Sequence, residues 1–180
     1  MPISTLVATA GSASANAYTT VAFADQFHLD RPTVGTTVAT GLWSAATTDQ
    51  KTAALLWATK LLDQYFEWNE YVTDATTPQA LLWPRTGLLS LNELSSLDEN
   101  TVPLQIQWAT AEFARQLLVS DRAGDSAVET QGIKLLKAGS IRIDFRDGVH
   151  AKPIPDVVVN LIPSAWGRLR ASGERELMRA

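Results

Sequence analysis

Residues 47–71 read TTDQKTAALLWATKLLDQYFEWNEY, and this stretch predicts the longest helix of the chain. Thr47 and Gln50 fit a capping box, in which each side chain satisfies a backbone amide of the first turn. Apolar residues then recur at steps of four and three, at Ala54, Ala58, Leu61, Tyr65 and Trp68. That spacing places them on one face of an amphipathic helix of about five turns. Leu55, Leu62 and Phe66 widen the apolar face, so we expect the helix to pack against more than one neighbour.

A second long helix is predicted from Pro103, in the stretch PLQIQWATAEFARQLLVSD. Proline is favoured in the first turn, because its missing N–H would have no partner there in any case. Most of the helix circumference is apolar, and only Gln105, Glu112 and Gln116 form a narrow polar line. Such a helix is either central to the core or buried against another subunit, and the sequence leaves both arrangements open.

Shorter helical and irregular segments flank the two long helices. A short helix is predicted from an N-cap at Thr19 or Thr20, and it ends before Pro32. Residues 33–43, TVGTTVATGLW, have no helical period and predict a loop or a short extended piece, with Trp43 anchoring it in the core. Near the C-terminus, a short apolar helix is predicted from Pro155.

A β-hairpin is predicted between the second long helix and Pro155. IRIDF, residues 141–145, alternates apolar and polar positions and indicates a half-buried strand. GIKLL, residues 132–136, is its predicted partner, with the turn at residues 137–140. A turn at Asp147-Gly148 is the alternative, but the two prolines of VHAKPIP make a poor second strand.

These elements predict a mainly α fold, a small helical bundle of two long helices plus short ones with a projecting antiparallel β-hairpin. The 180 residues suffice for one core, and a second domain would be cramped. We expect a flexible N-terminal arm at residues 1–17 and a helical domain at 18–163, with the hairpin around 132–146. A basic tail is expected at 164–180.

Charge is unevenly distributed along the chain. Residues 1–100 carry four basic groups and ten acids, whereas residues 142–180 carry seven basic groups and five acids. The net charge of −4 argues against a protein that mainly coats nucleic acid, because phosphate neutralisation needs an excess of Lys and Arg. The basic C-terminus is either an ordinary solvated end or a tail that docks on an acidic surface, such as that of a neighbouring copy.

The sequence contains no recognised pattern for catalysis or metal binding. There is no cysteine, and His28 and His150 are not in a metal-ligand spacing. No Walker loop, GxGxxG or GxSxG occurs, and the acids Asp98 and Glu99 suit a position just before a helix. We therefore predict no enzymatic activity, no metal and no cofactor, with a small hydrolase as the weakest alternative. No stretch approaches the ~20 apolar residues of a membrane span.

The six tryptophans raise the possibility of base stacking on single-stranded nucleic acid. Trp57, Trp68 and Trp108 fall at helical spacing among Leu and Ala, where an aromatic residue usually belongs to the core. Stacking platforms also need a basic groove, and the tryptophan-rich part of the chain is acidic. Core packing is the favoured interpretation for these three residues.

Residues 79–88, QALLWPRTGL, end an apolar segment on proline and glycine. Pro84 fixes its φ angle and ends the segment, and Gly87 permits the turn. Trp83 either packs inside the chain or contacts a neighbour. Arg85 either clamps its own loop or contacts another subunit, because arginine is over-represented in both roles.

Several of these segments occur in a characteristic order: ANAYTTVAFADQF, KTAALLWATKLLD, QALLWPRTGL, VPLQIQWATAEFARQLL and AGSIRIDF. Together they resemble the head–tail adaptor (head-completion) proteins of tailed bacteriophages, whose relatives are often labelled DnaT-like single-stranded DNA-binding proteins. The resemblance covers residues 15–163. It implies a structural virion protein of the neck, assembled in the host cytoplasm. The alternative function is that of a phage single-stranded DNA-binding replication protein.

The resemblance also implies the partners. They are further copies of the chain in a dodecameric ring, the portal protein, and the downstream neck or tail completion protein. DNA would pass through the ring without sequence-specific binding, which fits an acidic body. The candidate residues for a subunit or portal interface are Trp83, Arg85, Trp108, Arg142, Arg146, Trp166, Arg168, Arg170, Arg175 and Arg179.

Overall fold

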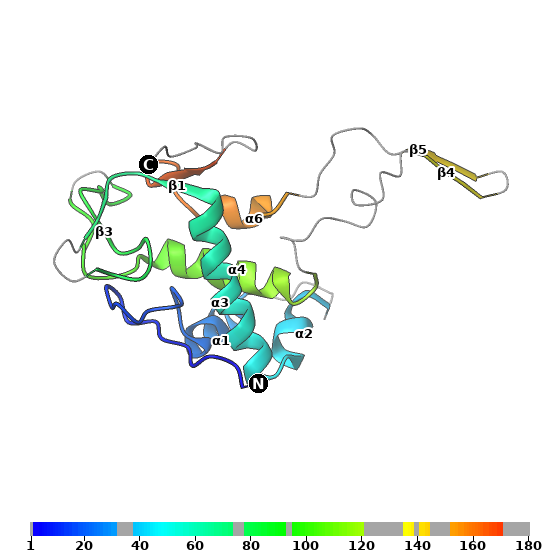
Figure 1. Cartoon of the computed structure of the whole chain (residues 1–180), viewed down its shortest axis with the longest axis horizontal. Helices are drawn as coiled ribbons and strands as arrows, with labels where there is room; N and C mark the ends of the chain where they lie inside the picture. The colour runs from blue at the N-terminus through cyan, green and yellow to red at the C-terminus, as the bar shows by residue number, and fades with distance from the viewer. Residues whose placement is uncertain are drawn as a thin grey trace, which may run out of the picture.

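The computed structural model describes residues 2–31, 38–73, 78–92, 95–120, 135–138, 141–144 and 152–170. For residues 38–40, 135–138 and 141–144 it describes the backbone only. Within these ranges it contains five helices and three two-stranded antiparallel sheets (Figure 1). The protein is therefore a small domain of helices and short antiparallel sheets, with more strand pairing than the hairpin that the sequence predicts.

Two long helices, α3 (Thr48–Tyr65) and α4 (Leu104–Leu117), cross at the centre of the domain (Figure 1). The capping box is confirmed, because the Gln50 N–H donates to Thr47 Oγ1 over 3.2 Å and the Thr47 N–H donates to Gln50 Oε1 over 2.9 Å. Leu55 and Leu62 of α3 and Phe113 of α4 are fully buried. Of the two arrangements open for the second helix, the structure places α4 in the core of its own chain.

The helix predicted to continue to Tyr71 ends at Tyr65 instead. Phe66–Trp68 forms strand β1, which pairs with β6 (Gly167–Leu169), and Trp68 lies opposite Gly167. Trp68 is buried, but it belongs to strand β1 and not to a helix. The prediction that it lies on a helical face was therefore wrong. Over so few residues, the apolar positions Phe66 and Trp68 fit a helical pattern and an alternating strand pattern equally well. The strand that decides between them, β6, lies about one hundred positions further along the chain, so the local sequence could not reveal it.

The first short helix is confirmed as α1 (Val21–Leu29), and Thr20 Oγ1 accepts the Phe23 N–H over 3.1 Å. The loop expected at residues 33–43 was wrong in its second part, because Val38–Ala45 forms helix α2. Residues 32–37 lie outside the described ranges. Trp43 is buried as predicted, and its indole N–H donates to Asp25 Oδ1 of α1 over 2.8 Å. This tertiary contact with α1 holds a segment whose own sequence carries no helical pattern.

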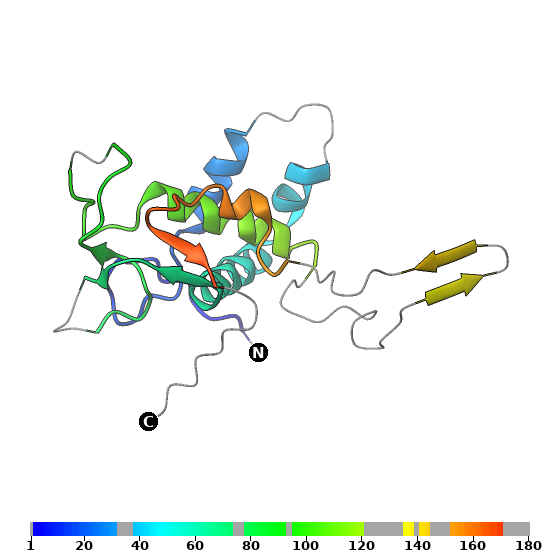
Figure 2. The ribbon, with the colours of Figure 1, turned by 90° about the horizontal axis from the view of Figure 1, so that it is seen from above.

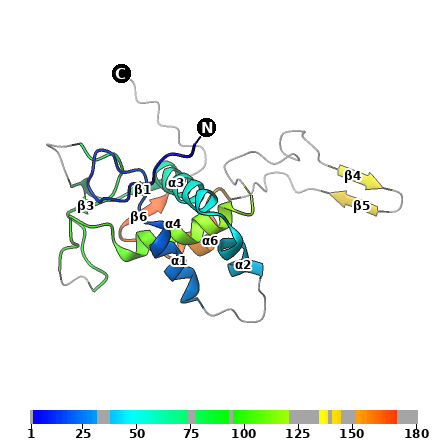
Figure 3. The ribbon, with the colours of Figure 1, turned by 90° about the horizontal axis from the view of Figure 1, so that it is seen from below.

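A hairpin is confirmed as β4 (Leu135–Ala138) and β5 (Ile141–Asp144), with Ala138 opposite Ile141. Its first strand lies later than predicted, because Lys137 and Ala138, expected in the turn, pair with Arg142 and Ile141. This register places the turn between the strands and not at Asp147-Gly148. The hairpin lies apart from the helices in Figure 1, Figure 2 and Figure 3. The short helix after Pro155 is confirmed as α6 (Asp156–Val159).

Both ends of the described chain contact the domain. Where the sequence predicts a flexible arm, the Asn16 N–H donates to the Val7 carbonyl over 2.9 Å, and Ala15 and Ala17 are buried. Within the predicted tail, Trp166 is buried and Gly167–Leu169 forms β6. A second small sheet pairs β2 (Tyr71–Val72) with β3 (Arg85–Thr86).

The β1–β6 pair predicts a sharp effect of substitution at Gly167. A Cβ atom there would lie 2.8 Å from the Glu67 carbonyl oxygen and 2.8 Å from a ring carbon of Trp68. We expect Gly167→Ala to lower the free energy of unfolding by about 1–3 kcal/mol, because a packed backbone must shift. Gly41→Ala is the matched control in α2, where nothing lies within 4 Å of the added Cβ, and it should raise that free energy by about 0.5–1 kcal/mol. Urea denaturation measures the free energy of unfolding of both variants. Equal values for Gly167→Ala and Gly41→Ala would contradict the strand pairing.

Candidate interaction surface

A groove of about 510 Å³ opens between α1, α4 and α6. Both α1 and α6 pack on α4 (Figure 3), and Trp108 and Glu112 of α4 line the groove between them. Most of the lining is apolar or aromatic, and the polar groups stand together near the end of α1. The lining residues are Phe23, Gln26, Phe27, Asp30, Arg31, Trp108, Glu112, Val157 and Leu161.

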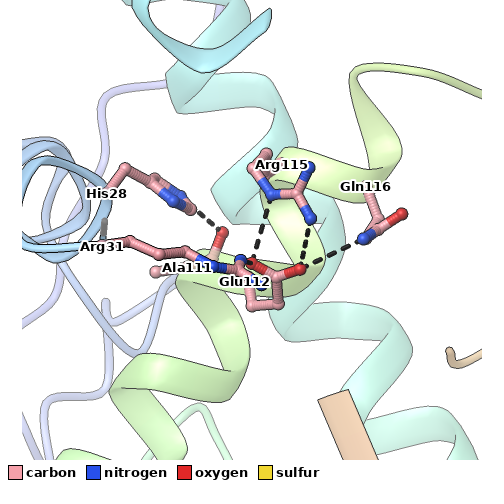
Figure 4. Close-up of polar contacts among 6 residues, drawn as sticks. All are labelled: His28, Arg31, Ala111, Glu112, Arg115 and Gln116. Carbon is pink, nitrogen blue, oxygen red and sulfur yellow. Dashed lines mark hydrogen bonds and ion pairs between the residues drawn. The ribbon is translucent and has the colours of Figure 1, made fainter. Parts of the chain in front are cut away.

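Glu112 forms the polar floor of this groove, and its side chain is only 1% exposed (Figure 4). Arg31 Nη1 of α1's C-terminal flank lies 2.6 Å from Glu112 Oε2. From the next turn of α4, Arg115 Nε donates to Glu112 Oε2 over 3.1 Å and Gln116 Nε2 donates to Glu112 Oε1 over 3.1 Å. Three side chains therefore donate to one buried carboxylate, and Arg31 ties the end of α1 to α4.

The charge state of Glu112 follows from these contacts. Burial alone would raise its pKa, but the hydrogen bonds from Arg115 and Gln116 and the charges of Arg115 and Arg31 outweigh it. The pKa of Glu112 is therefore held below its ordinary value, and the group is an anion at neutral pH. A buried charge is stable only while its hydrogen-bonding partners remain in place. Arg31, Arg115 and Gln116 therefore hold the Glu112 side chain in one position at the floor of the groove.

His28 lies beside this network and is neutral (Figure 4). Burial lowers its pKa from 6.5 to about 4, and the effect outweighs the hydrogen bond to Ala111 and the charge of Glu112. Its Nε2 lies 3.2 Å from the Ala111 carbonyl oxygen, which can only accept, so Nε2 carries the proton. The ring centroids of Phe27 and Trp43 lie 5.1 Å and 4.9 Å from that of His28. His28 thus joins α1, α2 and α4 behind the groove.

Arg85 clamps the loop of residues 79–88, which we call the Trp83 loop. Its guanidinium donates to the carbonyls of Asn69 and Leu82 over 2.7 Å and 3.0 Å, and to that of Glu70. Glu70 is held at a positive φ of 60°, a conformation that ordinary side chains seldom adopt. Of the two roles open for Arg85, the structure places it in the clamp of its own loop.

The other anchor of the Trp83 loop is Asp63 on α3. The Tyr18 hydroxyl donates to Asp63 Oδ1, and the Leu82 N–H donates to Asp63 Oδ2 over 3.3 Å. Burial raises the pKa of Asp63 from 3.8 to about 6, even though these hydrogen bonds act in the opposite direction. One carboxyl group thus connects the N-terminal segment, α3 and the Trp83 loop.

The structure separates the ten candidate interface residues into distinct groups. Trp83 and Trp166 are buried, and their ring centroids lie 5.9 Å apart in a row with Trp68. Trp108 lines the groove, while Trp57, expected in the core, is 38% exposed. The burial of Trp83, Arg85 and Trp166 leaves them no surface to offer a partner.

The remaining candidates are arginines. Arg168 and Arg170 are exposed at β6 and beside it, and Arg168 Nε lies 2.9 Å from Glu67 Oε2. Arg142 belongs to β5, whose backbone alone is described, and Arg146, Arg175 and Arg179 lie outside the described ranges. An interface role for these six arginines stays a prediction.

Most of the groove was not predicted from the sequence. Phe23 and Phe27 come from α1, and Val157 and Leu161 come from α6 and the turn that follows it. These apolar stretches are too short to show which neighbour covers them. The one available signal was the unusually apolar circumference of the helix from Pro103, because it required cover from several sides. Trp108 was the only groove residue among the predicted interface positions.

Other kinds of site are not found in the described ranges. These residues contain no group of three or more His, Asp or Glu side chains placed to hold a metal ion. None of the helices described is both long and apolar enough to cross a membrane.

Fold and groove together define a small domain of helices and short antiparallel sheets with an open apolar groove. A family model described as "Putative DnaT-like ssDNA binding protein" matches residues 5–179, and the chain belongs to that family. No curated protein and no solved structure matches the chain.

The clamp around Arg85 predicts a large cost for a conservative substitution. Arg85→Lys should lower the free energy of unfolding by about 2–3 kcal/mol, because an ammonium group cannot serve three carbonyls in a planar fork. Arg168→Lys is the matched control, and its exposed position predicts a change within about 0.5 kcal/mol. Chemical denaturation of both variants measures the difference, and equal stabilities would contradict the clamp.

The shifted pKa values of Asp63 and His28 predict opposite effects of pH on the free energy of unfolding between about pH 4 and pH 6. The unfolded chain loses the Asp63 proton near pH 3.8 and the folded chain near pH 6, so this group's contribution to stability falls as pH rises between them. The unfolded chain loses the His28 proton near pH 6.5 and the folded chain near pH 4, so this contribution rises with pH. Across their common window the two effects oppose each other in the unaltered chain.

Single substitutions should expose each effect. Relative to the unaltered chain, Asp63→Asn should become more stable as pH rises from about 4 to about 6, and His28→Gln should become less stable. Denaturation midpoints measured across this range for the three proteins give the slopes. Parallel curves for all three would show that neither group titrates as described.

Proposed function

We propose that the protein works by assembly, as a head–tail adaptor that forms a ring between a phage portal and the neck or tail. The observation that carries this proposal is an open, largely apolar groove in a domain whose tryptophans are mostly used internally. Trp43, Trp68, Trp83 and Trp166 are buried, whereas Phe23, Phe27 and Trp108 line accessible space. Exposed apolar surface rimmed by polar groups is typical of contacts between proteins.

Most of the cationic side chains that the structure describes are also engaged within the fold. Arg85 and Arg115 are buried, and Arg31, Lys51, Lys152 and Arg168 each pair with a carboxylate of the same chain. An adaptor that lets DNA slide through a ring needs few free cations on its body. The ordered set of sequence motifs that resembles phage adaptors supports the same function.

Single-stranded DNA binding is the second candidate, and the family description favours it over the first. This function requires a basic path with aromatic rings on which bases stack. The described residues offer exposed Tyr71 and Trp57 together with Lys60, Arg168 and Arg170. These side chains are spread over α3, the residues that follow it, and the C-terminal strand.

Two binding measurements separate the candidates. We expect the purified chain, mixed with the portal of the same phage, to form rings or portal complexes by cryo-electron microscopy and light scattering. A fluorescent thymidine oligonucleotide should not bind at low salt. Failure to associate with the portal under all assembly conditions would count against the adaptor, and oligonucleotide binding that falls steeply with salt would establish the second candidate instead.

A further inference from the structure

The groove between α1, α4 and α6 has the features of a peptide-binding surface. Val157 is 39% exposed at its edge, and aromatic rings from α1 and α4 form its walls. At one end stands Asp30, whose carboxylate accepts a hydrogen bond from Gln26 over 2.6 Å and has no cationic partner among the described residues. An apolar segment with a positive charge beside it would match this groove.

The chain itself supplies such a segment in residues 171–180, ASGERELMRA. Leu177 and Met178 form its only pair of large apolar residues. Arg179 follows them directly, and Arg175 lies two positions before Leu177, between Glu174 and Glu176. Methionine is flexible and packs well against aromatic rings, which suits a groove lined by phenylalanine and tryptophan. Arginine beside Asp30 would complete the charge that the described residues leave unpaired.

The position at which the described chain ends favours a neighbour's groove over its own. The Arg170 N–H donates to the Tyr65 carbonyl over 2.8 Å, at the C-terminal end of α3. From α6, strand β6 runs toward β1 and away from α1 (Figure 2). The described chain therefore ends beside the C-terminal end of α3, whereas the groove opens beside α1. Two different surfaces on one chain are what a head-to-tail contact between copies requires.

We propose that residues 171–180 of a second copy bind in the groove between α1, α4 and α6. Leu177 and Met178 contact the aromatic walls, and Arg175 or Arg179 lies beside Asp30. The inference rests on the assembly role proposed above and names the two surfaces through which copies join. It assigns the groove to self-association and not to the portal.

A fluorescent peptide of residues 170–180 tests the contact directly. The full chain carrying Leu177→Asp and Met178→Asp has a free groove, and it should bind the peptide saturably in fluorescence anisotropy. Val157→Asp added to this chain should weaken binding at least about tenfold, a loss of about 1.4 kcal/mol. Leu91→Asp is the matched control, because Leu91 is 60% exposed and lies outside the groove, and it should leave binding unchanged.

Charge exchange adds a result that misfolding cannot imitate. Asp30→Lys should weaken binding of the natural peptide, and a peptide with Arg175→Glu and Arg179→Glu should restore it. Absence of peptide binding, or binding that Val157→Asp leaves unchanged, would overturn the proposal. Near-ultraviolet circular dichroism of each variant checks that its fold is intact.

The mass of the full chain identifies the occupant of the groove. Self-association that is lost with the tail variant and with Val157→Asp, but kept with Leu91→Asp, supports a tail from a second copy. An unaltered chain that is monomeric and refuses the peptide, while the tail variant binds it, would place the tail in its own groove and overturn the proposal. Association lost with Val157→Asp alone would do the same, because another segment would then fill the groove.

Portal binding is measured separately on the same variants. Peptide binding without portal binding would refute the adaptor function and leave the tail contact standing. Portal binding without peptide binding would refute the tail contact and leave the adaptor function standing.

Discussion

The fold depends on one constraint, which is that α4 must be covered on nearly every side. Residues 109–115 are buried without interruption, although Glu112 among them still lines the groove. α3, α1 and α6 pack around it from distant parts of the sequence. Where α1 and α6 fail to meet, Trp108 and Glu112 remain at the floor of the groove. The candidate binding surface is thus the part of α4 that its own chain does not cover.

Covering α4 on nearly every side also buries charged side chains, and hydrogen-bond partners close to each charge offset the cost of its burial. Glu112 has three donors around it, and Arg85 has three carbonyl acceptors. Removing one member of such a set leaves the others buried without partners, which costs more than the interaction itself contributes. These sets make the domain specific in its arrangement, because a loop or helix placed elsewhere would leave buried polar groups unpaired.

Local patterns in the sequence predicted the elements whose signals are local. The capping box of Thr47 and Gln50 and the N-cap at Thr20 depend on residues within a few positions of one another, and both were confirmed. The strand at residues 141–144 also follows from its own alternating pattern, whereas the register of the hairpin was not predicted. The β1–β6 pair and helix α2 were missed, because the first joins Phe66 to Leu169 and the second depends on a contact from Trp43 to Asp25. The groove was missed for the same reason, since it exists only between helices that the chain brings together.

Whether the aromatic and cationic side chains are engaged inside the fold or accessible to a ligand distinguishes the two candidate functions more clearly than the number of these residues does. Six tryptophans and fifteen Lys and Arg residues would suit a protein that stacks bases and neutralises phosphates. In the described domain, however, Trp83 packs between Trp68 and Trp166, and Arg85 serves backbone carbonyls. A side chain that completes its own core is lost to a ligand, because withdrawing it would leave a cavity or an unpaired carbonyl. The groove between α1, α4 and α6 is lined chiefly by apolar residues, and apolar surface recognises another protein more readily than it recognises a phosphate backbone.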